Sequence, residues 1–80
     1  MKQYITYNSG ILGGKPIIAG TRMSVESVME LLSSGMGTNE ILKEYPFLTK
    51  EKISAAIEYA SSILKKEERY IFTNKHTALT

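Results

Sequence analysis

Cationic and hydroxyl side chains share one flank of a helix expected near residues 50–68, where their chemistry suits contacts with a nucleic acid. Lysine ammonium groups bind phosphates, and hydroxyl groups bond to phosphates or base edges. Residues near the beginning of a recognition helix normally contact bases, so the first members of the set are the strongest candidates. The candidate DNA-binding residues here are Thr49, Lys50, Ser54, Ser61 and Lys65.

The face of this helix that lies directly opposite the inward-facing Ile53 and Ile57 carries Glu51, Ala55, Glu58 and Ser62. Two carboxylates there would repel phosphates. The basic flank is therefore the better surface for a nucleic acid.

The glycine-rich segment near the N-terminus offers two further cations, Lys15 and Arg22, as possible phosphate contacts. Gly13-Gly14-Lys15 is not a phosphate-binding P-loop, because Pro16 and an extended run follow the lysine where a P-loop needs a helix. Arg22 has two interpretations. Its guanidinium either pairs inside the fold with Glu26 or Glu30, which we favour, or binds a carboxylate or phosphate in bidentate fashion.

Composition argues against an enzyme. The chain has no Asp and no Cys, and its single histidine, His76, lies near the C-terminus. No Ser–His–acid set and no cluster of metal ligands can be assembled from these residues, so we expect no catalysis, no metal and no cofactor.

The net charge of +2 is too small to require a nucleic-acid partner, although it permits one. The apolar runs are far shorter than the roughly 20 residues that cross a bilayer. The N-terminus lacks the apolar core of an export signal, so we expect a cytoplasmic protein without a membrane partner.

Local signals predict a β element over residues 4–23 and helices near 25–34, 39–45 and 50–68. Ser24 suits a helix N-cap, and Gly35 suits the left-handed residue that ends a helix. Pro46 blocks continuation of the second helix. The sequence thus predicts a mainly α fold, a small helix-turn-helix-like domain with a short N-terminal β hairpin or ribbon.

Apolar side chains recur at helical spacing in the first and third of these helices. From this pattern alone, residues 38–64 form either a helix-turn-helix or a helical hairpin that closes a small core. The residues predicted to face inward are Val25, Val28, Met29, Leu32, Ile53, Ala56, Ile57, Ala60 and Leu64.

We expect one domain over residues 1–64 and a C-terminal tail over residues 69–80. Within the tail, Tyr70, Ile71 and Phe72 either cover the core or bind a partner. A chain of 80 residues buries a modest share of its surface, which favours completion of the core by a second subunit.

Several of these features together resemble the DUF433 family over about residues 5–64. The matching segments are Gly14–Arg22, Val25, Leu31-Leu32, Gly35, Ile41-Leu42, Tyr45-Pro46, Leu48-Thr49, Ile53, Ala56 and Tyr59-Ala60. The resemblance implies a compact, mostly helical domain with a helix-turn-helix-like core and a small N-terminal β element.

Members of this family look like type II antitoxins encoded beside PIN-like nucleases. The resemblance therefore implies a homodimer that neutralises a PIN-like toxin RNase and represses its own operon by binding operator DNA. The alternative is a protein–protein interaction module that neutralises a partner without binding DNA.

Overall fold

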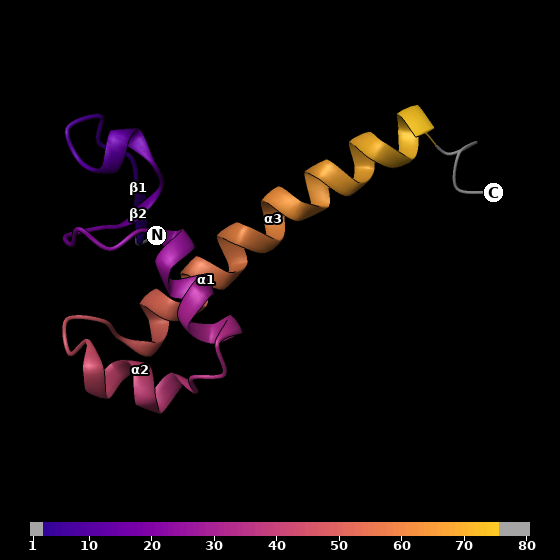
Figure 1. Ribbon diagram of the computed structural model, residues 1–80. Coiled ribbons are helices and arrows are strands. Elements are labelled where there is room, and N and C mark those ends of the chain that lie inside the picture. The colour runs from indigo at the N-terminus through magenta and orange to yellow at the C-terminus, as the bar shows by residue number, and fades with distance from the viewer. Residues whose placement is uncertain (1–2, 76–80) are drawn as a thin grey trace.

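The computed structural model describes the backbone of residues 3–75 and the side chains of residues 3–66. Three helices follow a two-stranded antiparallel hairpin, which confirms the predicted small, mainly α fold (Figure 1). The elements are β1 (Ile5–Thr6), β2 (Ile17–Ile18), α1 (Val25–Ser33), α2 (Thr38–Glu44) and α3 (Lys50–Lys75).

The hairpin pairs Ile5 with Ile18 and Thr6 with Ile17. After β2 the chain reverses at Gly20, whose φ of 80° lies in the left-handed region that glycine adopts without strain. The Thr21 hydroxyl closes this turn: it donates to the Ile18 carbonyl at 2.8 Å and accepts from the Met23 N–H at 3.0 Å. Thr21 therefore holds the chain that leads into α1.

The helix ends follow the local signals. The Ser24 hydroxyl accepts from the Ser27 N–H at 2.9 Å and caps α1, while Gly35 follows that helix with a φ of 101°. Tyr45 leaves the helical region before Pro46, so α2 ends at Glu44. At the start of α2, the Glu40 carboxylate accepts from the Gly37 N–H at 2.9 Å.

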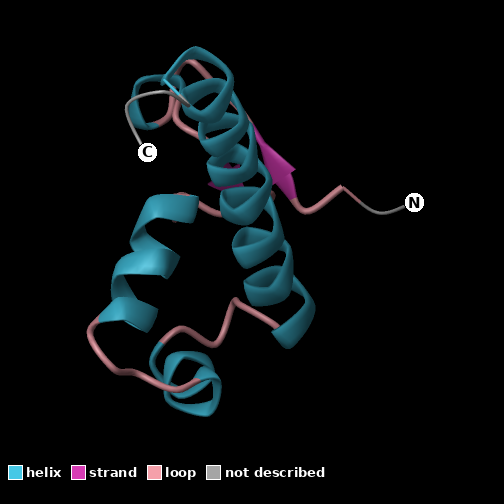
Figure 2. Ribbon diagram, turned by 90° about the vertical axis from the view of Figure 1, so that its right-hand side faces the viewer, coloured by secondary structure: helices cyan, strands magenta, loops and turns pink. Residues whose placement is uncertain are grey.

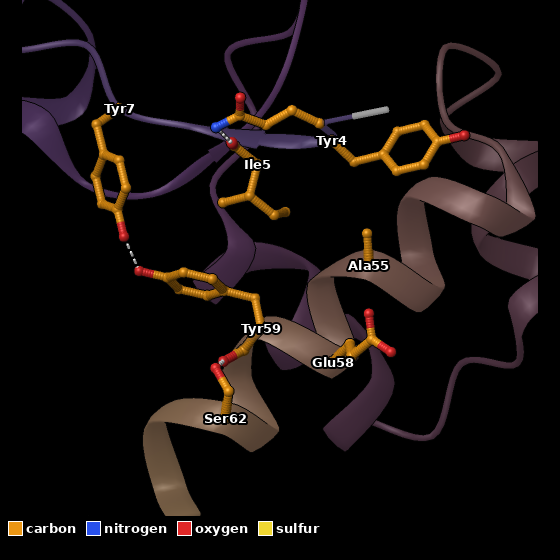
Figure 3. A pocket seen from close by; sticks show the side chains of 8 residues that line it. Tyr4, Ile5, Tyr7, Ala55, Glu58, Tyr59 and Ser62 are labelled. Atoms are coloured by element: carbon orange, nitrogen blue, oxygen red, sulfur yellow. Dashed lines mark hydrogen bonds between the residues drawn. The ribbon is translucent and has the colours of Figure 1, made fainter. Parts of the chain in front are cut away.

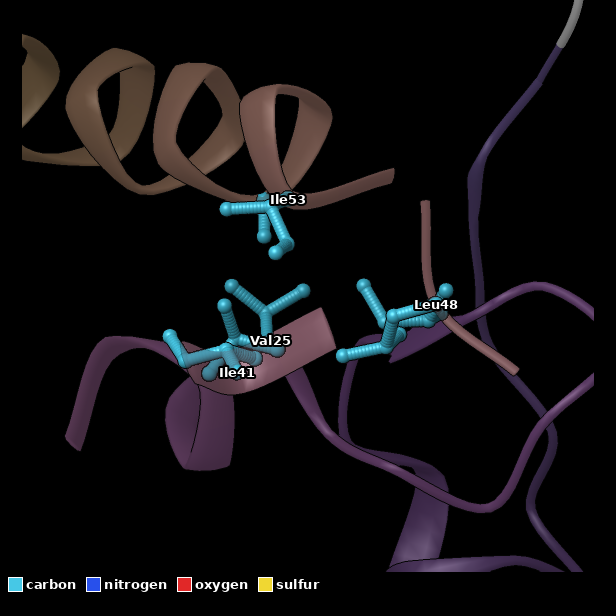
Figure 4. Close-up of a cluster of buried hydrophobic side chains, with 7 residues drawn as sticks. Val25, Ile41, Leu48 and Ile53 are labelled. Carbon is cyan, nitrogen blue, oxygen red and sulfur yellow. The ribbon is translucent and has the colours of Figure 1, made fainter. Parts of the chain in front are cut away.

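The core lies where the three helices meet the hairpin (Figure 4). Val28 and Ile41 are completely buried, and Ile53 is 2% exposed. These side chains come from α1, α2 and the first turns of α3, so burial of one shared apolar cluster fixes the helices against each other. The cluster consists of Ile18, Val25, Val28, Ile41, Leu48, Ile53 and Ala56.

Helix α3 runs on to Lys75, past the predicted end at residue 68. Residues 65–75 contain neither glycine nor proline, so nothing in the sequence stops the helix. The second half of α3 extends away from the other elements (Figure 1), and Figure 2 shows the hairpin beside the helix. Over its 26 residues, α3 is about 39 Å long at 1.5 Å per residue.

Two predicted core residues face outward. Ile57 is 42% exposed and Leu64 is 58% exposed, so their placement on the inner face was wrong. Ile57 follows Lys50 by seven residues, close to two helical turns, and therefore shares the flank of Lys50. Leu64 lies beyond the part of α3 that the short helices α1 and α2 can cover.

Candidate functional site

The basic flank of α3, defined as Lys50, Ser54, Ser61 and Lys65, is exposed at all four positions. These residues span about 22 Å along the helix. Ile57 lies between Ser54 and Ser61 and adds an apolar surface to the flank. Four of the residues predicted from the sequence thus form a straight, accessible stripe in the structure.

Thr49 lies at the start of this stripe and fixes the first turn of α3. Its hydroxyl accepts from the Lys52 N–H at 3.1 Å, while the Lys52 ammonium donates to the Phe47 carbonyl at 3.2 Å. These bonds anchor the link between α2 and α3. Thr49 therefore positions Lys50 and also remains exposed beside it.

A groove of about 530 Å³ separates the start of α2 from the first turns of α3. Lys50 and Ser54 line one wall, and Thr38 and Asn39 line the other. Two consecutive helices thus border one groove with polar side chains, to which Glu40 adds a carboxylate on the α2 wall. Thr38 and Asn39 were not among the predicted site residues, although their position at the start of a helix was an available signal.

Lys15 and Arg22 lie elsewhere. The Lys15 ammonium pairs with the Glu26 carboxylate at 3.0 Å, and Lys15 borders a groove between α1 and α3. Arg22 is exposed beside a separate hollow near Thr6 and Tyr7. The predicted pairing of Arg22 with Glu26 or Glu30 was wrong for the described residues, because Lys15 reaches Glu26 across the fold.

The groove bordered by Lys15 is lined mainly by apolar side chains. It measures about 580 Å³ and lies between α1 and the middle of α3. Ile63 and Leu64 line it and are 36% and 58% exposed. We call this surface the α1–α3 groove; its lining residues are Lys15, Pro16, Val25, Glu26, Met29, Tyr59, Ala60, Ile63 and Leu64.

The predicted partner-binding residues Tyr70, Ile71 and Phe72 belong to the last turns of α3 rather than to a separate tail. Their side chains lie outside the described residues. Their backbone continues the helix that carries Ile63 and Leu64 away from the domain (Figure 1).

On another side of α3, Tyr59 contacts the N-terminal strand. Its hydroxyl is hydrogen-bonded to the hydroxyl of Tyr7, and the two rings meet edge to face with centroids 6.3 Å apart (Figure 3). The bond to Tyr7 raises the pKa of Tyr59 above its ordinary value, and burial and the charge of Tyr7 act in the same direction. This contact joins β1 to α3 across 52 residues of sequence.

The raised pKa of Tyr59 has a testable consequence. The stabilisation from this pair is present at pH values below the ordinary tyrosine pKa near 10 and is lost as pH rises through the pKa of folded Tyr59. Replacement of Tyr7 by Phe removes the bond, so we expect the pKa of Tyr59 to fall. The chemical shift of the tyrosine ring Cζ, followed by NMR, measures this change.

Tyr4→Phe is the matched control, because Tyr4 lines the same surface without a hydrogen bond to Tyr59 among the described contacts. The pKa of Tyr59 should stay raised in that variant. An unchanged titration of Tyr59 in Tyr7→Phe would contradict the assigned contact.

Within residues 3–75, no helix combines the length and apolar character needed to cross a membrane. The described residues also contain no group of three or more His, Cys, Asp or Glu side chains placed to hold a metal ion. The features described so far are surfaces suited to binding: a basic flank, an apolar groove and the contact between Tyr7 and Tyr59.

Comparison with known proteins agrees with this architecture. The family model described as "Protein of unknown function (DUF433)" matches residues 5–60. A crystal structure of a DUF433 member protein from Anabaena variabilis superposes with a TM-score of 0.75 at 31% identity, covering 88% of this chain and 69% of that chain.

The uncharacterized protein y4eO of Sinorhizobium fredii (strain NBRC 101917 / NGR234) is 32% identical over 71 residues, which is 89% of this chain. The chain spans about a third of the length of that relative, 32%.

Proposed function

The chain belongs to the DUF433 family, and from that premise we propose that it is a cytoplasmic antitoxin-like regulator without enzymatic activity. In this proposal it neutralises a PIN-like toxin RNase and, as a homodimer, binds operator DNA. The observation that carries the proposal is that the two halves of α3 present different surfaces. Its first half is packed in the domain with an exposed basic flank, and Ile63 and Leu64 are exposed where its second half begins to project.

Three features support DNA binding through the basic flank. The flank is straight and accessible, and Lys50 begins it at the start of the longer helix. The groove between α2 and α3 adds Thr38 and Asn39 beside Lys50 and Ser54. Lys65 adds a second cation at the far end of the flank, while the Glu58 carboxylate borders the flank beside Ser54 and Ser61, four and three residues away along the helix.

Binding of the toxin is supported by the α1–α3 groove. Exposed Ile63 and Leu64 lie where the helix leaves the domain, and apolar side chains of α1 continue the surface. Contiguous apolar surface of this kind marks protein–protein contacts. Tyr70, Ile71 and Phe72 extend the same helix and remain our candidates for the far end of the contact.

Replacement of Lys50 by Glu tests the DNA half of the proposal. A mobility-shift assay on the chain's own promoter region should show a retarded band that weakens steeply with salt, because cations displace counterions from phosphates. We expect Lys50→Glu to weaken this binding at least tenfold and to flatten the salt dependence. The exposure of Lys50 predicts an unchanged fold by circular dichroism.

Lys66→Glu is the control, since it makes the same charge change on α3 and Lys66 is exposed but lies off the basic flank. It should lower DNA affinity much less than Lys50→Glu. Equal effects of the two variants would remove Lys50 from the contact. Absence of any shifted band at low salt with the parent chain would overturn the DNA half.

The second candidate is an interaction module that neutralises its partner without binding DNA. The α1–α3 groove favours this candidate, because a partner protein can bind that groove without contacting the basic flank. Inhibition of the nuclease by a chain that shifts no DNA would establish this alternative.

A further inference from the structure

A groove between β1 and α3 is separate from the basic flank and from the α1–α3 groove, apart from the shared residue Tyr59. It measures about 450 Å³, and Figure 3 shows its side chains converging from the strand and the helix. We call it the β1–α3 groove; it is lined by Gln3, Tyr4, Ile5, Tyr7, Ala55, Glu58, Tyr59 and Ser62.

The outer edge of β1 lies beside this groove and has no partner strand among the described residues. The Tyr4 carbonyl accepts from the Ala19 N–H at 2.7 Å, so the next residue, Ile5, directs its N–H and carbonyl away from β2. The Gln3 side-chain amide donates to the Ile5 carbonyl at 3.2 Å, which shows that this carbonyl is accessible from outside. An exposed strand edge is a template for another extended segment.

The charge of the groove indicates what kind of segment fits. Glu58 contributes a carboxylate, and none of the eight described residues that line the groove is basic. The rings of Tyr4, Tyr7 and Tyr59 border it, and aromatic faces attract the cations of lysine and arginine. The small side chain of Ala55 leaves space on the helix wall. The Ser62 hydroxyl already donates a hydrogen bond to the Tyr59 carbonyl at 2.7 Å.

We infer that the β1–α3 groove binds an extended, basic peptide segment of a partner protein by addition of a strand to β1. The segment bonds to the Ile5 backbone in place of Gln3, and one lysine or arginine side chain reaches Glu58 past the tyrosine rings. Lys50 lies eight residues, about 12 Å, before Glu58 on α3, so charge reversals at the two positions test separate contacts.

Selection of peptides from a random display library against the full chain tests this inference. We expect the selected peptides to be enriched in lysine or arginine at one position within a β-prone stretch. Glu58→Lys, an exposed substitution, should weaken binding of a selected peptide at least tenfold in fluorescence anisotropy. Methylation of alternate backbone amides of that peptide should weaken binding equally, because strand addition needs those N–H groups.

Glu44→Lys on α2 is the matched control, an exposed charge reversal away from the groove, and it should leave peptide binding unchanged. Lys50→Glu should also leave it unchanged, so failure of the DNA proposal and failure of this one remain distinguishable. No basic enrichment, or binding that survives Glu58→Lys, would overturn the inference. A shift in sedimentation that Glu58→Lys abolishes would assign the groove to a second copy of the chain instead.

Discussion

Replacement of Ile53 by alanine is expected to lower the free energy of unfolding by about 2–5 kcal/mol, the usual cost of removing a large buried side chain. Ile53 is 2% exposed and lies between α1 and α2 in the core cluster. A chain of 80 residues has a total stability of roughly 4–12 kcal/mol. The substitution should therefore remove much of the stability, measured by urea unfolding followed by circular dichroism.

Ile57→Ala provides a matched control, because it makes the same exchange of isoleucine for alanine about one helical turn further along α3. Ile57 is 42% exposed, so its truncation should change stability by about 0.5 kcal/mol or less. A loss for Ile57→Ala as large as that for Ile53→Ala would show that Ile57 is buried, by the fold or by a second subunit. Measurement at several protein concentrations separates those two causes, because only dimer stability depends on concentration.

This pair of isoleucines also shows where prediction from sequence succeeds and where it stops. Helix ends depend on nearby residues, so Ser24, Gly35 and Pro46 located them correctly to within a residue or two. The inward placement of Ile53 and Ala56 was correct as well. Ile57 was misplaced because helical spacing defines a stripe on α3 but not how wide an arc of that helix the other elements cover; Ala60, further along α3, packs against the core while Ile57 does not.

The contacts between distant segments were beyond local patterns. Lys15 reaches Glu26, and Tyr7 reaches Tyr59, only because the hairpin lies across the start of α1 and the side of α3. The sequence contained these residue types but no signal for their pairing. The end of α3 was missed for another reason: no breaker follows Leu64, but the short apolar run from Tyr70 to Phe72 was assigned to a separate tail.

For the candidate site, the sequence identified the basic flank as a set, because spacing along one helix is local information. It did not separate that flank from Lys15 and Arg22, which the fold carries to other surfaces. The grooves could not be predicted at all, since each has walls from two elements. The α1–α3 groove is therefore a finding of the structure, and it leads to the second large effect.

Replacement of Leu64 by Glu is expected to weaken binding of the PIN-like partner at least 100-fold, which corresponds to about 2.7 kcal/mol. Leu64 is 58% exposed in the α1–α3 groove, and a carboxylate buried there by a partner would lose its hydration without gaining a counterpart. The fold should be unaffected, because the side chain is exposed in the free chain. Isothermal titration calorimetry with the partner, together with its nuclease activity, measures the loss.

Ser54→Glu is the control for this prediction, because it adds the same charge to the basic flank at an exposed position about 15 Å before Leu64 along the helix. It should spare partner binding and weaken DNA binding, while Leu64→Glu should do the reverse. That crossed outcome follows from the geometry of α3, whose flank and groove lie at different angles around one helix. If the Leu64→Glu variant and the parent chain inhibit the nuclease equally, the partner does not bind at the α1–α3 groove.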